Sequence, residues 1–471
     1  MQPEQRPIDA RSGKAKRKKR CFCEWPVDLA GHPALASQSC RNPMVALGFS
    51  TTMALRRVFI TGIGAISPNG LGREEFWRNS RQGKSGVRRI SRFNCSGQPV
   101  QIAGEVIGFD PLLYLSAREL EGTGLATPYA IAAAGEALED AKLEWKTMDL
   151  DALRKVGVYV GSGGGNQEFT ERQYSLYYSG QQKKCSVYVI PSSTLGTLAS
   201  EISMQYGFRG LSHMFSNGCT SSTDAIGYAF RAIKHGEAEF VVCGGVDAPI
   251  APLTLRGFQL LRIMSTSSNE APEKASKPFS ANRDGFVLAE GAWFFVMESE
   301  ESAIKRGVPV YGEILGYGAT CEAFHRVRLE EVGIEPARAM QLAMLEGGLV
   351  PSDFDYLHYH GTATHLNDRV ETTAVKLAFG EHASRMPGSS IKSMIGHPQG
   401  ACGAASMAVT LLAMRDGFAP PTINLEEAAA ECGLDYVANA GRPLEIKKAM
   451  VNTIAFGSKN AAIAVGKVNS V

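Results

Sequence analysis

One order of segments occurs twice along the chain, around residues 130–165 and again around residues 337–364. In both places a helical pattern leads through a short acidic linker to a short apolar run and then to a turn of small residues. The first run, Val156–Gly161 (V-G-V-Y-V-G), is closed by S-G-G-G, and the second, in D-Y-L-H-Y-H, is closed by G-T. A repeated order of elements indicates an internal duplication, so we expect two similar halves.

The rest of the chain continues this alternation of strands and helices. Val58–Gly62 is a β-branched run that ends in G-I-G, and residues 127–143 and 336–349 have helical spacing. Val241–Gly245 and Ala462–Gly466 form a further candidate pair of related strands. Near-continuous apolar strands that alternate with helices are typical of parallel sheets covered on both faces. The sequence therefore predicts an α/β protein with two mixed, mostly parallel sheets.

The composition is that of a soluble globular enzyme of 471 residues, with 44% hydrophobic and 20% charged residues. The first 53 residues hold 9 of the 49 Lys and Arg and 4 of the 47 Asp and Glu. The rest of the chain therefore has 40 basic and 43 acidic residues. This slight excess of negative charge argues against nucleic-acid binding by the main part of the chain. No run of about 18 apolar residues occurs, so we expect no membrane span. The ten cysteines are scattered without metal-ligand spacing, so we expect a reduced, cytoplasmic protein without metal or cofactor.

Residues 1–53 form a separate basic segment, in which Lys14–Arg20 reads K-A-K-R-K-K-R. One interpretation is a nuclear or anionic-surface address. The other is a disordered extension or a start codon placed too early, and we favour it because basic blocks alone often mislead. Met53, followed by A-L-R-R-V-F-I-T-G-I-G, looks like a natural start. We therefore divide the chain into this extension, a half at 54–308 and a half at 309–471.

Cys219 lies in the small-residue segment S-N-G-C-T-S-S, before a stretch with helical spacing. The positive end of a helix favours the thiolate form of a cysteine, and Gly218 permits a tight turn and the close approach of a substrate. The alternative is a small, buried and inert cysteine, which is the common case for a single thiol. Two histidine segments elsewhere in the chain count against that alternative.

His360 ends the strand pattern Y-L-H-Y-H before G-T-A-T, where active sites of α/β proteins form, and His358 shares its face of the strand. His397 ends I-K-S-M-I-G-H, five residues after Lys392. A buried ammonium group is costly unless it is paired, so we expect Lys392 to serve the site. One thiol with two imidazoles suits carbon–carbon bond formation between thioesters better than hydrolysis, for which one histidine suffices.

Phe456 lies in N-T-I-A-F-G-S-K-N, before Gly457, and offers a bulky side chain beside an exposed backbone N–H. Alone this segment would be a strand end. Together with the cysteine and histidine segments it predicts a donor for an oxyanion.

Five motifs together are similar to those of β-ketoacyl-acyl-carrier-protein synthases, from about Arg57 to Lys467. They are V-F-I-T-G-I-G, S-K-P-F-S-A-N-R-D-G-F-V-L-A-E-G-A, H-G-T-A-T-H-L-N-D, K-S-M-I-G-H and A-P-P-T-I-N-L. The order Cys, His, His resembles the elongating type II enzymes of fatty-acid and polyketide synthesis. The resemblance implies the thiolase fold, with two halves in αβαβα layers. It also implies an acyl-carrier protein as partner and a homodimer or ketosynthase heterodimer.

The resemblance implies a decarboxylative condensation. Cys219 would take an acyl group from its carrier, and a malonyl-carrier thioester would lose CO2. His360 and His397 would stabilise the resulting enolate, which attacks the acyl carbonyl, while the N–H groups of Cys219 and Phe456 form the oxyanion hole. Lys392 would orient the site electrostatically and Phe456 would gate it. Contacts to the pantetheine arm would come from Thr362 and Thr364.

Several positions depart from the family pattern. Asn217 lies in an altered trio before the cysteine, and Ser458 and Lys459 replace small, neutral residues near the gate, where Ser458 is a candidate substrate contact. Ser406 stands where a glutamate commonly pairs the lysine, and Gly164 stands where a bulky aliphatic side chain divides the acyl pocket. The departure at residue 164 favours a specialised polyketide or polyene pathway over fatty-acid elongation, with ordinary drift as the alternative.

Two other functions stay open from the residues. One is a non-condensing, chain-length-factor-like partner subunit, although such subunits usually lack the cysteine. The other is a malonyl decarboxylase or acyl-transfer role, which applies if Ser406 leaves Lys392 poorly positioned.

Overall fold

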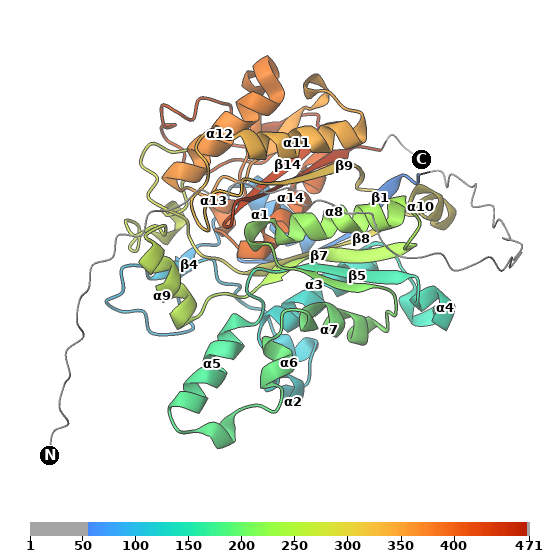
Figure 1. Cartoon of the computed structure of the whole chain (residues 1–471), viewed down its shortest axis with the longest axis vertical. Helices are drawn as coiled ribbons and strands as arrows, with labels where there is room; N and C mark the ends of the chain where they lie inside the picture. Colours follow the sequence, from blue (N-terminus) through green and yellow to red (C-terminus); the bar gives the residue numbers. More distant parts are fainter. Residues whose placement is uncertain (1–54, 469–471) are drawn as a thin grey trace, which may run out of the picture. The chain divides into compact units, whose positions relative to one another are not determined.

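One mixed sheet of eleven strands runs through the computed structural model, which describes residues 55–468 (Figure 1). Its strands, in the order in which they lie side by side, are β11 (Gly388–Ser389), β10 (Tyr356–His358), β14 (Lys448–Ala455), β15 (Lys459–Gly466), β9 (Gly312–Cys321), β1 (Val58–Ser67), β8 (Gly291–Ser299), β7 (Phe240–Asp247), β5 (Val156–Gly161) and β6 (Ser212–Phe215), with β2 (Gly70–Leu71) beside β1. Two small ribbons consist of β3 (Arg88–Arg89) with β4 (Ile102–Ala103) and β12 (Phe418–Ala419) with β13 (Arg442–Pro443).

The sheet consists of two halves with the same order and sense of strands. From the middle outward the first half runs β1, β8, β7, β5, β6 and the second runs β9, β15, β14, β10, β11. In each half the two inner pairings are antiparallel and the two outer pairings are parallel. The predicted duplicated α/β fold is therefore confirmed. The suggestion that Val241–Gly245 and Ala462–Gly466 are equivalent strands of the repeat is wrong. Val241–Gly245 lies in β7, whose counterpart by position is β14, whereas Ala462–Gly466 lies in β15.

The prediction of two mostly parallel sheets is wrong in detail. Antiparallel pairing of β1 with β9, through Val58 to Ile60, joins the two halves into one sheet. The inner strands are antiparallel although they are as apolar as parallel strands. The reason is that helices cover both of their faces, and burial on both faces gives the same hydrophobic run in either direction.

Helices form the layers on both sides of the two halves and between them. They are α1 (Arg73–Arg81), α2 (Ala117–Leu120), α3 (Ala126–Asp140), α4 (Leu150–Leu153), α5 (Gln167–Tyr178), α6 (Val189–Ser193), α7 (Thr197–Tyr206), α8 (Ser221–Lys234), α9 (Pro252–Leu261), α10 (Glu300–Arg306), α11 (Ile334–Gly347), α12 (His365–Phe379), α13 (Lys392–Ile395) and α14 (Cys402–Asp416). Helices α3 and α7 pack on the first half, and α11 packs on β9 and β15 of the second (Figure 1).

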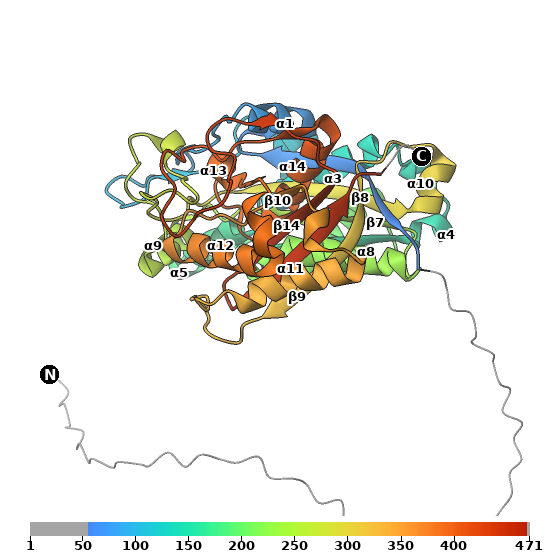
Figure 2. The same cartoon turned by 90° about the horizontal axis from the view of Figure 1, so that it is seen from above.

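The middle layer is made of α8 and α14, which contact each other and strands of both halves. Small residues allow the close approach: a Cβ added to Gly403 would lie 2.0 Å from Oγ1 of Thr223. Almost every side chain of α14 is buried, as expected for a helix that is apolar all round. Both views place α9, α12 and α13 at one end of the sheet and α4 and α10 at the other (Figure 2).

The predicted elements correspond to observed ones with small shifts. The helix expected at 127–143 is α3, the helix expected at 336–349 is α11, and the strand Val156–Gly161 is β5 with the predicted bounds. The basic extension at 1–53 lies outside the described residues. Within residues 55–468 no helix is both long and apolar enough to cross a membrane.

Candidate active site

Cys219 lies at the start of the middle layer, in the single 3-10 turn Gly218–Thr220 that leads into α8. Gly218 has a φ of 67°, a left-handed conformation that favours glycine, and Oγ of Ser221 donates to its carbonyl at 2.5 Å. Cys219 is buried, with 6% of the residue exposed. The predicted position at a helix start is thus observed, with the sulfur buried between the two halves.

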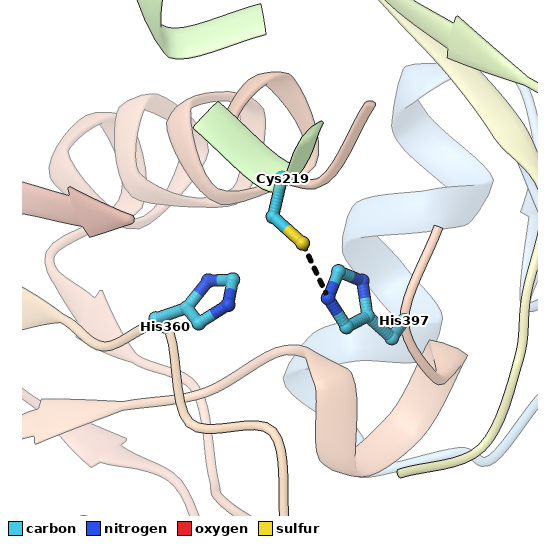
Figure 3. A group of neighbouring side chains, drawn as sticks. All are labelled: Cys219, His360 and His397. Carbon is cyan, nitrogen blue, oxygen red and sulfur yellow. Dashed lines mark hydrogen bonds between the residues drawn. The ribbon is translucent and has the colours of Figure 1, made fainter. Parts of the chain in front are cut away.

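The structure brings the three predicted reactive residues together (Figure 3). Sγ of Cys219 lies 3.1 Å from Nε2 of His397, although 178 residues separate them in sequence. The rings of His360 and His397 lie 5.3 Å apart and nearly perpendicular. His360 follows β10 and His397 follows α13, so strand and helix ends of the second half present both imidazoles to the thiol of the first.

Hydrogen bonds assign the same tautomer to both imidazoles. Nδ1 of His397 accepts from the backbone N–H of Gln399 at 3.1 Å, and Nδ1 of His360 lies 3.3 Å from the ammonium of Lys392. Burial, together with the charge of Lys392, holds the pKa of both histidines well below its usual range, so both rings are neutral. A neutral ring that accepts at Nδ1 carries its proton on Nε2. The site thus holds two neutral Nε2–H donors.

The thiol of Cys219 differs from the sequence-based expectation of a thiolate. Burial, aided by the neighbouring Cys402, raises its pKa well above the usual value, while Lys392 and the backbone N–H of Phe456 act in the opposite direction. A helix terminus contributes about 0.3–1 kcal/mol, whereas full burial moves a pKa by up to about 3–5 units. Desolvation therefore wins, and the resting thiol is protonated.

Phe456 lies in the turn of the β14–β15 hairpin, where its backbone N–H is near enough to Cys219 to lower the pKa of the thiol. Its side chain is 36% exposed. The ammonium of Lys392 is buried at 1% exposure and donates to the carbonyl of His360 at 2.7 Å. Lys392 thus holds the His360 backbone as well as facing its ring. Ser406 is also buried, and its hydroxyl finds no partner within residues 55–468.

Two buried carboxylates that the sequence analysis missed hold the turn after β10. Glu371 accepts from the N–H of His360 at 2.6 Å and of Gly361 at 2.7 Å, and burial raises its pKa to about 7. Asp368 accepts from the N–H of Thr362 at 3.0 Å. Both lie on α12, in the motif T-H-L-N-D-R-V-E, whose spacing of three residues was the available signal.

A third buried carboxylate, Asp247 at the end of β7, joins two turns of the site. Its oxygens accept five hydrogen bonds of 2.7–2.9 Å, from Oγ of Ser162 and the N–H groups of Gly163, Gly164, Gly165 and Gly400. The turn after β5 and the turn after His397 are therefore tied through one side chain.

A cavity of about 270 Å³ opens onto the three reactive residues. Thr362 and Thr364 line it, with their hydroxyl oxygens 3.0 Å apart, and Phe456 lines it as well. Arg262 and Arg328 also border the cavity and are exposed, so they place positive charge at its open side. These two arginines had no motif signal.

The remaining predicted substrate contacts lie elsewhere. Gly164 borders a second cavity of about 520 Å³, which shares Gln399 with the first. Ser458 is buried and does not line the first cavity. Its hydroxyl donates to the carbonyl of His325 at 2.9 Å and accepts from the N–H of the same residue at 3.1 Å. The geometry therefore supports a loop contact for Ser458 in place of a substrate contact.

The reactive trio also has the donor set of a metal site. Ligand atoms of Cys219, His360 and His397 lie within 4.8 Å of one another, and one thiolate with two imidazoles suits zinc. The ammonium of Lys392 beside His360 opposes a cation at this place. Sequence spacing could not indicate this grouping because the three segments lie far apart in the chain.

Comparison with known proteins accounts for this arrangement. The family model for the beta-ketoacyl synthase N-terminal domain matches residues 55–303, and the model for the beta-ketoacyl synthase C-terminal domain matches residues 311–426. The 3-oxoacyl-[acyl-carrier-protein] synthase 2 of Coxiella burnetii is 38% identical over 88% of this chain and 100% of its own.

A relative from Streptomyces coelicolor, the actinorhodin polyketide putative beta-ketoacyl synthase 1, is 39% identical over 87% of this chain and 88% of its own. The solved ishigamide ketosynthase/chain length factor has a TM-score of 0.82 and 30% identity, over 88% of this chain and 100% of that one. With both domain models matched and close relatives aligned along nearly their whole length, the chain belongs to the beta-ketoacyl synthase family.

Proposed function

We propose that this chain condenses an acyl group held on Cys219 with a malonyl group on acyl-carrier protein, and releases CO2 and β-ketoacyl-carrier protein. The observation that carries the proposal is the convergence of a thiol, two neutral imidazole N–H donors and the Phe456 N–H on one cavity. The names of the relatives, which include synthases of 3-oxoacyl-carrier protein, support the same reaction.

The first step transfers the acyl group. Sulfur of Cys219 attacks the carbonyl carbon of an acyl-carrier thioester, the carbon–sulfur bond to the carrier breaks, and the thiol proton passes to the leaving carrier thiolate. The buried thiol loses its proton only as the new bond forms, and Nε2–H of His397 at 3.1 Å stabilises the charge on sulfur. The tetrahedral oxyanion is bound by the N–H groups of Cys219 and Phe456.

The second step makes the carbon–carbon bond. The malonyl thioester loses CO2, and its bonding electrons form an enolate whose oxygen accepts from Nε2–H of His360 and His397. The enolate carbon attacks the acyl carbonyl, and the Cys219 thiolate leaves and takes up a proton from solvent. Neutral histidines suit this step because they donate hydrogen bonds without becoming acids that would quench the carbanion.

Other residues position the substrates. Lys392 holds the ring and carbonyl of His360, and the hydroxyls of Thr362 and Thr364 face the cavity, where they suit the amides of a pantetheine arm. Arg262 and Arg328 at the open side suit the phosphate of that arm and the acidic surface of a carrier protein. The reaction needs no metal or redox cofactor in this scheme.

The pathway is the finer part of the proposal. Gly164 borders the second cavity and brings no side chain into it, and this supports a long or wide acyl chain in polyketide or polyene assembly. The relatives include both a 3-oxoacyl-carrier synthase and a polyketide synthase, so their names do not decide. A panel of acyl-carriers with malonyl-carrier, read by product mass, tests this point, and exclusive use of saturated straight chains would exclude a specialised pathway.

The assembly is proposed as a homodimer or a heterodimer with a related subunit. Among the described residues β6 is an edge strand with exposed residues, and helix α5 of the same half exposes Tyr174, Tyr177 and Tyr178. An open edge and an apolar flank are the features that a partner strand would cover. We also retain the division into a thiolase-like half at 54–308 and another at 309–471. We propose the cytoplasm as the compartment, which the free cysteines of the described residues support.

The deciding experiment is intact-mass detection of an acyl adduct on Cys219 after mixing with acyl-carrier protein. We expect the adduct in the native protein and none in Cys219→Ala. Condensation by Cys219→Ala would refute the assignment, whereas its retained malonyl decarboxylation is compatible with the separate roles of thiol and histidines. A chain-length-factor-like subunit would form no adduct and is not favoured.

A further inference from the structure

Two positions that depart from the family pattern contact each other across the active site. Nζ of Lys459, the first residue of β15, donates to Oδ1 of Asn217 at 3.3 Å. Asn217 precedes Gly218 and Cys219, so this bond links the hairpin that carries Phe456 to the turn that carries the nucleophile. The two segments are separated by 242 residues in sequence.

The amide of Asn217 is held on its other side as well. Its Nδ2 donates to Oδ2 of Asp224 at 2.8 Å, and Oγ1 of Thr220 donates to the same oxygen at 3.1 Å. The other carboxylate oxygen accepts from the hydroxyl of Tyr317 on β9 at 2.7 Å. Asp224 is 5% exposed, so Asn217 is anchored to a buried group of α8.

The hairpin turn is short and is fixed from its far side. Ala455 and Lys459 form the last pair of the β14–β15 ladder, which leaves three residues in the turn. Ser458 in that turn has a φ of 63°, and its hydroxyl bonds both backbone groups of His325. Two anchors therefore follow Phe456 closely in the chain: Ser458 holds the turn to the neighbouring loop, and Lys459 holds it to the nucleophile turn.

We propose that Lys459 and Asn217 are positioning residues, which hold the Phe456 turn against the Cys219 turn and so fix the spacing of their two backbone N–H groups. This inference rests on the proposed function, because the two groups matter together only if they bind one oxyanion. Donors to an oxyanion must lie within about 2.7–3.1 Å of it, so a small shift of one turn weakens one of the two bonds.

The test measures the acyl-transfer half-reaction to Cys219 in single turnovers, with rate constant and half-saturation determined separately. Lys459→Met should lower the rate constant about tenfold and leave half-saturation within about twofold, since ground-state binding does not use the oxyanion donors. Asn217→Ala should have a similar effect. The double variant should be no slower than the slower single variant, because both substitutions break one connection.

Three controls separate positioning from a general loss of structure. Lys459→Arg, which retains a donor of similar reach, should restore most of the rate. Lys467→Met removes an exposed lysine just beyond the other end of the same strand, and it should act as the native protein. In a Cys219→Ala background, Lys459→Met should leave malonyl decarboxylation unchanged, because that step uses the histidines.

The outcomes divide clearly. Native protein that forms no acyl adduct would overturn the proposed function and this inference with it. A native adduct with a Lys459→Met rate within twofold of native, or with fully multiplicative effects in the double variant, would overturn the positioning role alone. Equal losses in acylation and decarboxylation would identify Lys459 as a general structural residue and also refute the role.

Discussion

Replacement of Asp247 by Asn should loosen two turns of the active site at once. The carboxylate receives hydrogen bonds from four backbone N–H groups and one hydroxyl, with Oδ2 facing Gly163 and Gly400 and Oδ1 facing Ser162, Gly164 and Gly165. An amide has one acceptor oxygen and one NH2 group. Whichever way the Asn side chain turns, its NH2 group points at backbone donors and leaves them without an acceptor.

The better orientation places the NH2 group at the Oδ2 position and orphans two N–H groups, at Gly163 and Gly400. A buried donor without a partner costs about 1–3 kcal/mol, so we expect a loss of about 4 kcal/mol. That is a large part of the roughly 5–15 kcal/mol by which a domain of this kind is stable. Activity should fall with it, because the turn after His397 loses one anchor.

Urea unfolding at neutral pH measures the loss of unfolding free energy. The midpoint and the slope are fitted together, because a changed slope would indicate a change in the denatured state or a departure from two-state unfolding. Asp355→Asn is the matched control, because its Oδ2 also accepts two backbone N–H groups, at 2.7 Å from Lys447 and 3.0 Å from Lys448. Asp355 is only half-buried, so an Asn can turn its NH2 group to water and should cost under about 1 kcal/mol. Equal stabilities of Asp247→Asn and native protein would refute the carboxylate's role.

Three further predictions concern the cavity, the pH dependence and the histidines. Gly164→Leu should shorten the longest acyl group accepted, measured as product mass with an acyl-carrier panel; unchanged products would place the acyl chain outside the second cavity. The folded-state pKa of Glu371, about 7, lies above its usual 4.5, so its contribution to stability is complete below that usual value and declines as pH rises through 7. Glu371→Gln should flatten urea midpoints between about pH 5 and 8, and an unaltered slope would contradict this. His397→Ala should slow malonyl decarboxylation about 100-fold or more while Cys219 still acylates; equal effects on both steps would argue against separate roles.

Much of the fold was predictable because the duplication repeats a pattern that burial imposes. The repeated order of helix, linker, strand and small turn corresponds to β5 and β10, which hold equivalent places in the two halves. Strand direction was not predictable, since β8 and β15 are buried on both faces and are therefore apolar whichever way they run.

The reactive residues of the site were predictable, and so were Lys392 and Phe456 beside them, but the buried carboxylates that hold the turns were not. Cys219, His360 and His397 lie in small-residue turns, where an unusual side chain stands out. Asp247 and Glu371 lie in elements where a single acidic residue would be interpreted as exposed to solvent. Only the structure reveals the backbone N–H groups that converge on their carboxylates. The protonated thiol likewise depends on burial by segments far away in sequence.

The middle layer of α8 and α14 makes the active site a product of assembly rather than of either half alone. The thiol enters from the turn before α8 of the first half, and both imidazoles enter from strand and helix ends of the second. A chain cut between α10 and β9 would therefore yield two inert fragments. Their activity should return only on complementation, with a rate that depends on fragment concentration, so turnover becomes a direct reporter of the docking of one half on the other.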